Sequence, residues 1–257
     1  MTPRDVVLAA IDAIFVRFDV EAAENLLAPD LIQHNPSIPT GAQAILNLIP
    51  VLRDSGIRVE RHRVIAEGNL VVVHATYFNA QALGGETLVA FDVYRVENGR
   101  IAEHWDNLRE MPQTSTSGHS MTDGNTGIRH LEQTADNKAL VETFVDAILA
   151  NYDVDRITEF VSRETYTQHN PNIADGYQNL ASNLRTQISE GHPAPYSKTH
   201  LVVAEGNFVF LASEGLLRST TPTAYFDLFR VDDGKIVEHW DVMANVPSDM
   251  VHTNGKF

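Results

Sequence analysis

The chain carries nearly the same sixteen residues twice. FDVYRVENGRIAEHWD occupies residues 91–106 and FDLFRVDDGKIVEHWD occupies residues 226–241, which is a separation of 135 positions. The motif QHNP recurs at the same separation, at 33–36 and 168–171. Solenoid repeats are shorter, about 20–45 residues, and occur in longer series. A long unit that occurs only twice therefore predicts two similar domains.

The boundaries of these domains follow from a change in composition. The stretch PQTSTSGHSMTDGNTG after the first repeat is rich in Ser, Thr and Gly and has almost no apolar residues, which is typical of a flexible connection. We expect a first domain at 1–111, a linker at 112–134, a second domain at 135–250 and a tail at 251–257.

Charge and cysteine content exclude several classes of function. The net charge of −15 disfavours nucleic acid as a partner, because an acidic surface repels phosphate groups. The chain has no cysteine, which excludes disulfides, thiolate metal sites and a cysteine nucleophile. We see no signal-peptide pattern and no apolar run of the about 18–20 residues that a membrane span needs. The expectation is a cytoplasmic protein without a membrane partner.

Each repeat begins with helical periodicity and ends with hairpins. Helical segments are expected at 5–18, at 20–28 and from Gly41 in the first repeat, and at 140–152, at 154–161 and from Gly176 in the second. The Asn-Gly pair in the first hairpin motif and the Asp-Gly pair in the second are strong turn signals between apolar strands. Helices followed by an antiparallel meander predict an α+β fold, with the helices on one face of a curved sheet.

Strand alternation places His104 and Asp106 on one face of the last strand, with Trp105 on the other. Two interpretations follow: the His and Asp side chains lie on the wet outer face, or they point into a concavity under the helices. We favour the concavity, because both copies keep His-x-Asp while neighbouring positions differ, as in Tyr94 and Phe229.

The QHNP loop, the repeated hairpin and the order of helices before meander resemble the SnoaL-like polyketide cyclase family, within the nuclear-transport-factor-2-like superfold. The resemblance covers nearly all of both repeats. It implies two tandem cone-shaped α+β barrels, each with N-terminal helices packed on a curved antiparallel sheet. It also implies an intramolecular pseudo-dimer, with Trp105 and Trp240 near the interface, and leaves further homo-oligomerisation open.

The resemblance implies an enzyme that uses acid–base chemistry without metal or cofactor on a hydrophobic carbonyl compound, as in the aldol ring closure of polyketide cyclases. A carboxylate removes a proton next to a carbonyl, and the resulting enolate attacks a second carbonyl. The expected catalytic residues are Asp106, His104, His34, Asp241, His239 and His169. The expected substrate-binding residues are Asp92, His74, Tyr94, Asp227, Asn35 and Asn170. For the two asparagines a helix cap is the favoured alternative.

The two sites need not be alike. Through the AEGN motifs at 66–69 and 204–207, His74 corresponds to Ala212 and Thr76 corresponds to Glu214. If these side chains line the pockets, the pockets differ, and the first has the fuller set of His and Asp.

Three alternatives stay open at this point. The same pocket could serve an isomerase, a dehydratase or an epoxide hydrolase, since fold does not fix function. It could also be a small-molecule-binding module without catalysis. A metal site built from His34, His74, His104 and Asp106 is disfavoured, because no dense His-x-His motif is present.

Overall fold

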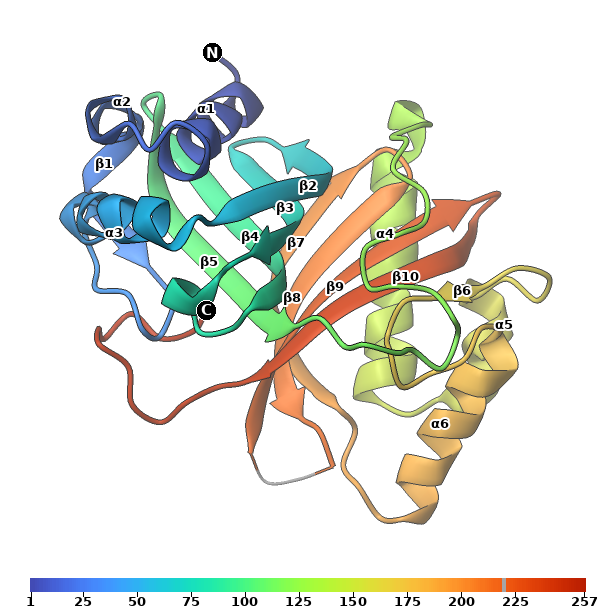
Figure 1. The fold of residues 1–257 in the computed structure, drawn as a ribbon. Helices are drawn as coiled ribbons and strands as arrows, with labels where there is room; N and C mark the ends of the chain where they lie inside the picture. Colours follow the sequence, from blue (N-terminus) through green and yellow to red (C-terminus); the bar gives the residue numbers. More distant parts are fainter. Residues whose placement is uncertain (219–220) are drawn as a thin grey trace. The chain divides into compact units, whose positions relative to one another are not determined.

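The computed structural model describes residues 1–218 and 221–257 (Figure 1). The chain divides into two compact units. The first unit contains Met1–Met111 and Pro247–Phe257, and the second contains Pro112–Val246. The segment expected to be a linker therefore lies within the second unit, and the C-terminal tail lies within the first.

The two units share one order of α-helices and strands, which is two helices, a strand, a helix and four strands, but they differ in their short helical turns. The first has α1 (Pro3–Phe15), α2 (Val20–Leu26), β1 (Leu27–Gln33), α3 (Ala42–Ser55), β2 (Arg58–Glu67), β3 (Leu70–Phe78), a 3₁₀ turn (Gln81–Leu83), β4 (Thr87–Glu97) and β5 (Arg100–Glu110). The second has a 3₁₀ turn (Leu131–Gln133), α4 (Thr134–Phe144), a π-helical turn (Val145–Ala150), a 3₁₀ turn (Val154–Arg156), α5 (Ile157–Phe160), β6 (Thr167–Gln168), α6 (Tyr177–Ser189), β7 (Tyr196–Glu205), β8 (Phe208–Leu216), β9 (Pro222–Asp232) and β10 (Lys235–Asn245).

Each unit has one five-stranded sheet. The strand order is β1-β5-β4-β3-β2 in the first unit and β6-β10-β9-β8-β7 in the second. The four long strands of each sheet are antiparallel, while β1 and β6 pair parallel to β5 and β10. The predicted α+β class is confirmed, but the sheets are mixed and open rather than antiparallel and closed into barrels.

The fifth strand of the first sheet, β1, is not predicted from the sequence, because its residues LAPDLIQ contain Pro29 and show no clear alternation. Proline lacks the N–H of a ladder bond and is tolerated mainly at sheet edges, which is where β1 lies. A second proline, Pro50, lies inside a helix, since α3 runs from Ala42 past Pro50 to Ser55.

Local signals set the helix ends. Thr2 and Asp5 form a capping box at the start of α1, with Pro3 as the first helical residue. Helix α3 ends at Gly56, whose φ of 69° is left-handed and favours glycine.

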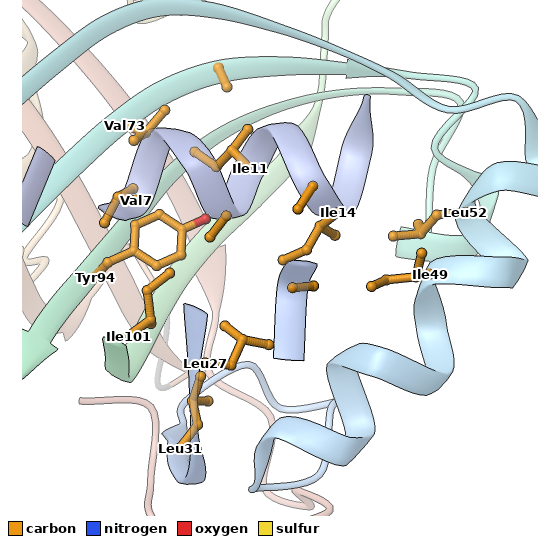
Figure 2. Packing of buried hydrophobic residues seen from close by; sticks show 14 of the residues in the cluster. Val7, Ile11, Ile14, Leu27, Leu31, Ile49, Leu52, Val73, Tyr94 and Ile101 are labelled. Carbon is orange, nitrogen blue, oxygen red and sulfur yellow. The ribbon is translucent and has the colours of Figure 1, made fainter. Parts of the chain in front are cut away.

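The core of the first unit lies between the helices and one face of the sheet. Figure 2 shows Val7, Ile11 and Ile14 of α1 packed over Val73 and Tyr94 of the sheet. The residues that alternate with these on the strands face the other side. His104 and Asp106 share the helix side with Tyr94, so the concavity interpretation of the strand pattern is confirmed.

Across the described residues, no helix is both long enough and apolar enough to cross a membrane.

Candidate functional site

A cavity lies between helices and sheet in the first unit, and we call it the first pocket. Its cavity volume is about 70 Å³. Most of its lining is aliphatic and comes from α1, β1, α3 and the ends of the strands. Polar side chains from the sheet and the QHNP loop line the rest, namely Asn35, Tyr77, Asp92, Tyr94, His104 and Asp106.

A β-bulge sets the face on which the last strand presents its polar residues. Arg95 pairs with Glu103 but Val96 pairs with Ile101, so β5 has one extra residue there. The extra residue reverses the alternation, and Ile101 and His104 both line the pocket although three positions separate them.

A chain of hydrogen bonds orients His104. The side-chain oxygen of Gln33 accepts the backbone N–H groups of His34 and Asn35, at 2.9 Å and 2.8 Å. The same oxygen lies 3.1 Å from His104 Nδ1, which therefore carries a hydrogen and donates it. His104 Nε2 is left facing Asp92 Oδ1 at 3.1 Å.

Asp92 also binds a tyrosine. The hydroxyl of Tyr77 donates to Asp92 Oδ2 at 2.9 Å. Burial raises the pKa of Asp92 above its usual 3.8. Burial, with the Asp92 charge second, also raises the pKa of Tyr77 and of Tyr94 well above 10, so both phenols stay protonated and can donate. One proton shared between Asp92 and His104 satisfies both groups.

Asp106 is the second carboxylate of the pocket. It pairs with Asp92 across the neighbouring strands. Its Oδ2 accepts a hydrogen bond of 2.6 Å from the side-chain amide of Asn35. Asp106 is 4% exposed, so the carboxylate meets the cavity rather than bulk water. An oriented carboxylate at the polar end of an apolar cavity is suited to moving protons.

The second unit has a corresponding cavity of about 280 Å³, the second pocket. Its lining includes Asn170, His239 and Asp241. Asn170 donates to Asp241 Oδ2 at 2.6 Å. Gln168 accepts from His239 Nδ1 at 3.0 Å, and His239 Nε2 lies 3.0 Å from Asp227, which is fully buried behind the lining.

The two units supply the tyrosine of this network from different strands. Tyr77 belongs to β3, and the AEGN offset makes Gly215 of β8 its counterpart. In the second unit Tyr196 of β7, the strand partner of Gly215, places its hydroxyl 2.9 Å from both oxygens of Asp227. A Cβ atom on Gly215 would lie 1.7 Å from the carbonyl oxygen of Pro195, so a side chain there would block this approach. The same bond is thus built in two ways.

Two of the predicted catalytic histidines lie outside the pockets. His34 stacks on Trp105 with ring centroids 4.9 Å apart, and His169 stacks on Trp240 at 4.6 Å. Each also bonds the glutamate before that tryptophan, Glu103 at 2.9 Å or Glu238 at 3.1 Å. The prediction that they partner the pocket aspartates is wrong, because backbone alternation directs the preceding glutamine inward and the histidine outward.

His74 is also misplaced by the prediction. It stacks on Phe91 at 4.3 Å, on the face of the sheet away from the core, because Val73 and Tyr77 face the helices. Thr76 lies on the same outer face and bonds His62, while Glu214 lies 3.4 Å from His200. The difference expected between the pockets on the basis of these positions is therefore absent.

The other predicted residues lie together around the two carboxylates. Asp227 is an exception to its predicted role, because it is fully buried behind the lining of the second pocket and does not face the cavity. Tyr94 stacks on His104 at 4.7 Å, and Phe229 stacks on His239 at 4.5 Å. The asparagines reach the carboxylates, and the helix-cap alternative is wrong, because glycines occupy the N-caps of α3 and α6. Sequence reasoning missed Gln33 and Gln168, which the repeated QHNP motif contained, and the tyrosines Tyr77 and Tyr196.

Each unit also contains a group of side chains that could hold a metal ion. The ligand atoms of Asp92, His104 and Asp106 lie within 4.8 Å of one another, as do those of Asp227, His239 and Asp241. Two carboxylates and an imidazole are acceptable ligands for a divalent cation. Both ring nitrogens of His104 already bond Gln33 and Asp92, so a metal would have to displace one of these bonds.

The comparisons with solved structures find similar single domains. IdmH from Streptomyces antibioticus, described as a candidate polyketide cyclase, is 20% identical, with 42% of this chain and 92% of that chain covered and a TM-score of 0.36. An NTF2-like protein of unknown function from Cytophaga hutchinsonii is 22% identical, with 42% and 91% covered and a TM-score of 0.36. An LEH-like epoxide hydrolase from M. tuberculosis is 23% identical, with 44% and 85% covered and a TM-score of 0.35.

No curated protein matches the chain. A family model does match it, twice. The model describes a SnoaL-like domain and matches residues 7–104 and 141–239, which together are more than half of the chain. The chain therefore belongs to the SnoaL-like domain family and carries two copies of the domain in tandem.

Proposed function

We propose that this protein is a cofactor-independent acid–base enzyme that acts on a hydrophobic carbonyl compound, with ring closure of the polyketide cyclase type as the reaction. The observation that carries the proposal is Asp106, a buried carboxylate oriented by Asn35 at the polar end of an apolar cavity. Asp241, oriented by Asn170, has the same place in the second pocket.

The proposed reaction begins with proton transfer. Asp106 takes a proton from the carbon next to a carbonyl, and the C–H electron pair forms the enolate. The enolate carbon attacks a second carbonyl of the same molecule, forming a C–C bond and an alkoxide. Asp106 returns its proton to the alkoxide, so the enzyme ends as it began and no other reactant is needed.

Neighbouring groups have supporting roles in this scheme. Tyr94 lines the pocket and keeps its proton, because burial raises its pKa, so its hydroxyl is a donor for a developing oxyanion. A second acid–base group, the pair of His104 and Asp92, lies beside Asp106. Its hydrogen bonds with Gln33 and Tyr77 fix its orientation and the positions of its protons.

Proton exchange tests the proposal without the natural substrate. Hydrophobic ketones and 1,3-diketones that bind the protein by ligand-observed NMR are incubated with it in D₂O. We expect the protons next to the carbonyl to be replaced by deuterium faster than in buffer alone. A ketone that binds in the pocket without any acceleration would favour the binding-module alternative.

The same assay distinguishes the other reactions. Migration of a double bond indicates an isomerase and loss of water indicates a dehydratase. Incorporation of ¹⁸O from labelled water into an added epoxide indicates an epoxide hydrolase. Each of these outcomes would replace ring closure while keeping the pocket.

Three expectations from the resemblance stay proposals. These are the pairing of the two domains as an intramolecular pseudo-dimer, a further homo-oligomer and a cytoplasmic location. Size-exclusion chromatography with light scattering tests the oligomer directly.

A further inference from the structure

Each repeat is followed by an extension. Residues 112–123 follow the first repeat and residues 247–257 follow the second, and Pro112 and Pro247 stand at the repeat separation of 135. The extension after the second repeat lies within the first unit, and the extension after the first repeat lies within the second unit.

The C-terminal extension runs along the QHNP loop of the first unit. The N–H of Val251 donates to the carbonyl of Pro36 at 3.0 Å, and Asn254 donates to the carbonyl of Gln33 at 2.9 Å. His34 Nδ1 lies 3.0 Å from the carbonyl of Gly255, to which it can donate. These contacts bind the extension beside the loop that carries Asn35.

The other extension has the same register on the second unit. Thr116 donates to the carbonyl of Pro171 at 2.8 Å, and His169 Nδ1 lies 2.7 Å from the carbonyl of Ser120. Thr116 and Ser120 stand 135 positions before Val251 and Gly255, and their loop partners stand 135 positions after those of Val251 and Gly255. The docking is therefore a feature of both repeats and not an accident of the chain end.

One position in this shared register differs in charge. The residue after Gly255 is Lys256, and the residue after Ser120 is Met121. The ammonium group of Lys256 donates to the backbone carbonyl of Asp106 and lies 3.5 Å from its carboxylate oxygen Oδ1. The side chains of Lys256 and Asp106 are only 6% and 5% exposed. Met121 is also buried, at 1% exposure, but its thioether has no charge.

We propose that the C-terminal extension is a working part of the first pocket, in which Lys256 is the positioning residue for Asp106, and that the two pockets are therefore not equivalent. Asp106 is held between Asn35 on one oxygen and Lys256 on the other side. Bonds in which a charged group takes part are shorter and stronger than neutral ones, and a buried charge needs a partner. The inference rests on the proposed function only in treating Asp106 as the reacting group.

Lysine ammonium NMR tests the contact directly. The chain has four lysines, Lys138, Lys198, Lys235 and Lys256, so the spectrum contains few signals. We expect a slowly exchanging Lys256 signal that disappears in Lys256→Met. Asp106→Asn should shift this signal, while Asp241→Asn should leave it in place. Lys235→Met is the control for assignment.

Two results would overturn the proposal. One is a Lys256 signal that Asp106→Asn does not move, and the other is fast exchange of Lys256 with solvent, since a buried and bonded ammonium exchanges slowly. Asn preserves the shape of Asp, so the test does not depend on a disruptive variant. None of these readouts needs turnover, so they stand even if the proposed function fails.

The functional consequence is measured in an Asp241→Asn background, in which the first pocket acts alone. Lys256→Met should lower kcat for deuterium exchange about ten- to a hundredfold, as expected when a reacting group is displaced by about 1 Å, with a smaller change in KM. Lys256→Arg should restore part of the rate. Unchanged kcat in Lys256→Met would reject the positioning role.

Discussion

Both units contain a hydrogen bond between a buried aspartate and a tyrosine, but the tyrosine comes from a different strand in each unit. Tyr77 and Tyr196 come from strands that do not correspond, yet each donates to the aspartate that faces the pocket histidine. A contact simply inherited from the duplication would use the same position in both units. The bond to Asp92 or Asp227 is therefore common to both units, although the position of the tyrosine is not.

Removing either hydroxyl should destabilise its own unit. Tyr77→Phe and Tyr196→Phe each leave a buried carboxylate with one donor fewer, which costs about 1–3 kcal/mol. Urea unfolding followed by tryptophan fluorescence measures the free energy of unfolding. Tyr152→Phe, which removes a bond to the carbonyl of Pro193 at the surface, is the control and should cost less. Equal losses in all three variants would contradict the special role of the network.

Two buried carboxyls should give opposite pH dependences. Burial raises the pKa of Asp92 above 3.8, so its native state binds the proton more tightly than the unfolded chain. Its contribution to stability therefore falls as pH rises from 3.8 through the raised value.

Burial alone would raise the pKa of Glu238, but bonds from His169 and Arg230 outweigh it and lower that pKa below 4.5. Its contribution is present above 4.5 and is lost as pH falls.

Substitution should remove each of these dependences. In Asp92→Asn, the decrease in the free energy of unfolding as pH rises above 3.8 should become smaller. In Glu238→Gln, the decrease as pH falls below 4.5 should become smaller. Trp105 and Trp240, one in each unit, report the two transitions separately in single-tryptophan variants. The same direction of change in both variants would contradict the assigned pKa shifts.

At the scale of elements, the sequence predicts what depends on regular alternation and misses what depends on tertiary pairing. The hairpin pattern places His104 and Asp106 on one face, and the structure agrees. The parallel edge strand β1 has no such pattern, so the outward direction of His34 could not be read from it. Tyr196 could not be assigned either, because its place depends on the close approach of Pro195 to Gly215.

The approach of these two strands gives a direct prediction. Gly215→Ala puts a Cβ atom 1.7 Å from the Pro195 carbonyl oxygen, so β7 must shift and carry Tyr196 away from Asp227. We expect a loss of about 1–3 kcal/mol in the free energy of unfolding, measured by urea denaturation. Gly127→Ala is the matched control, since the nearest atom to its Cβ lies at 3.6 Å. Equal stability of the two variants would contradict the packing described here.

At the scale of the whole molecule, the tandem arrangement gives one chain two pockets with the same aspartate, histidine and asparagine but different surroundings. The first pocket is lined by Tyr94 where the second is lined by Phe229. In the first unit Lys256 contacts Asp106, and the corresponding position of the second unit is Met121. The second pocket is also the larger cavity.

Single substitutions should therefore remove single sites. Asp106→Asn and Asp241→Asn should each remove one component of deuterium exchange and leave the other, because changes at sites that share no partner are close to additive. A panel of ketones of different size separates the components, with the larger ones exchanged in the second pocket. Loss of all exchange in either single variant would mean that the pockets do not act independently.

The most direct test of the central claim is the exchange rate of a bound ketone in the double variant Asp106→Asn and Asp241→Asn. The proposed mechanism predicts a rate about 10²- to 10⁴-fold below that of the unmodified protein, which is the usual contribution of a positioned acid–base group. Ketone binding should be largely retained. A double variant that exchanges at the rate of the unmodified protein would show that these carboxylates do not move the proton.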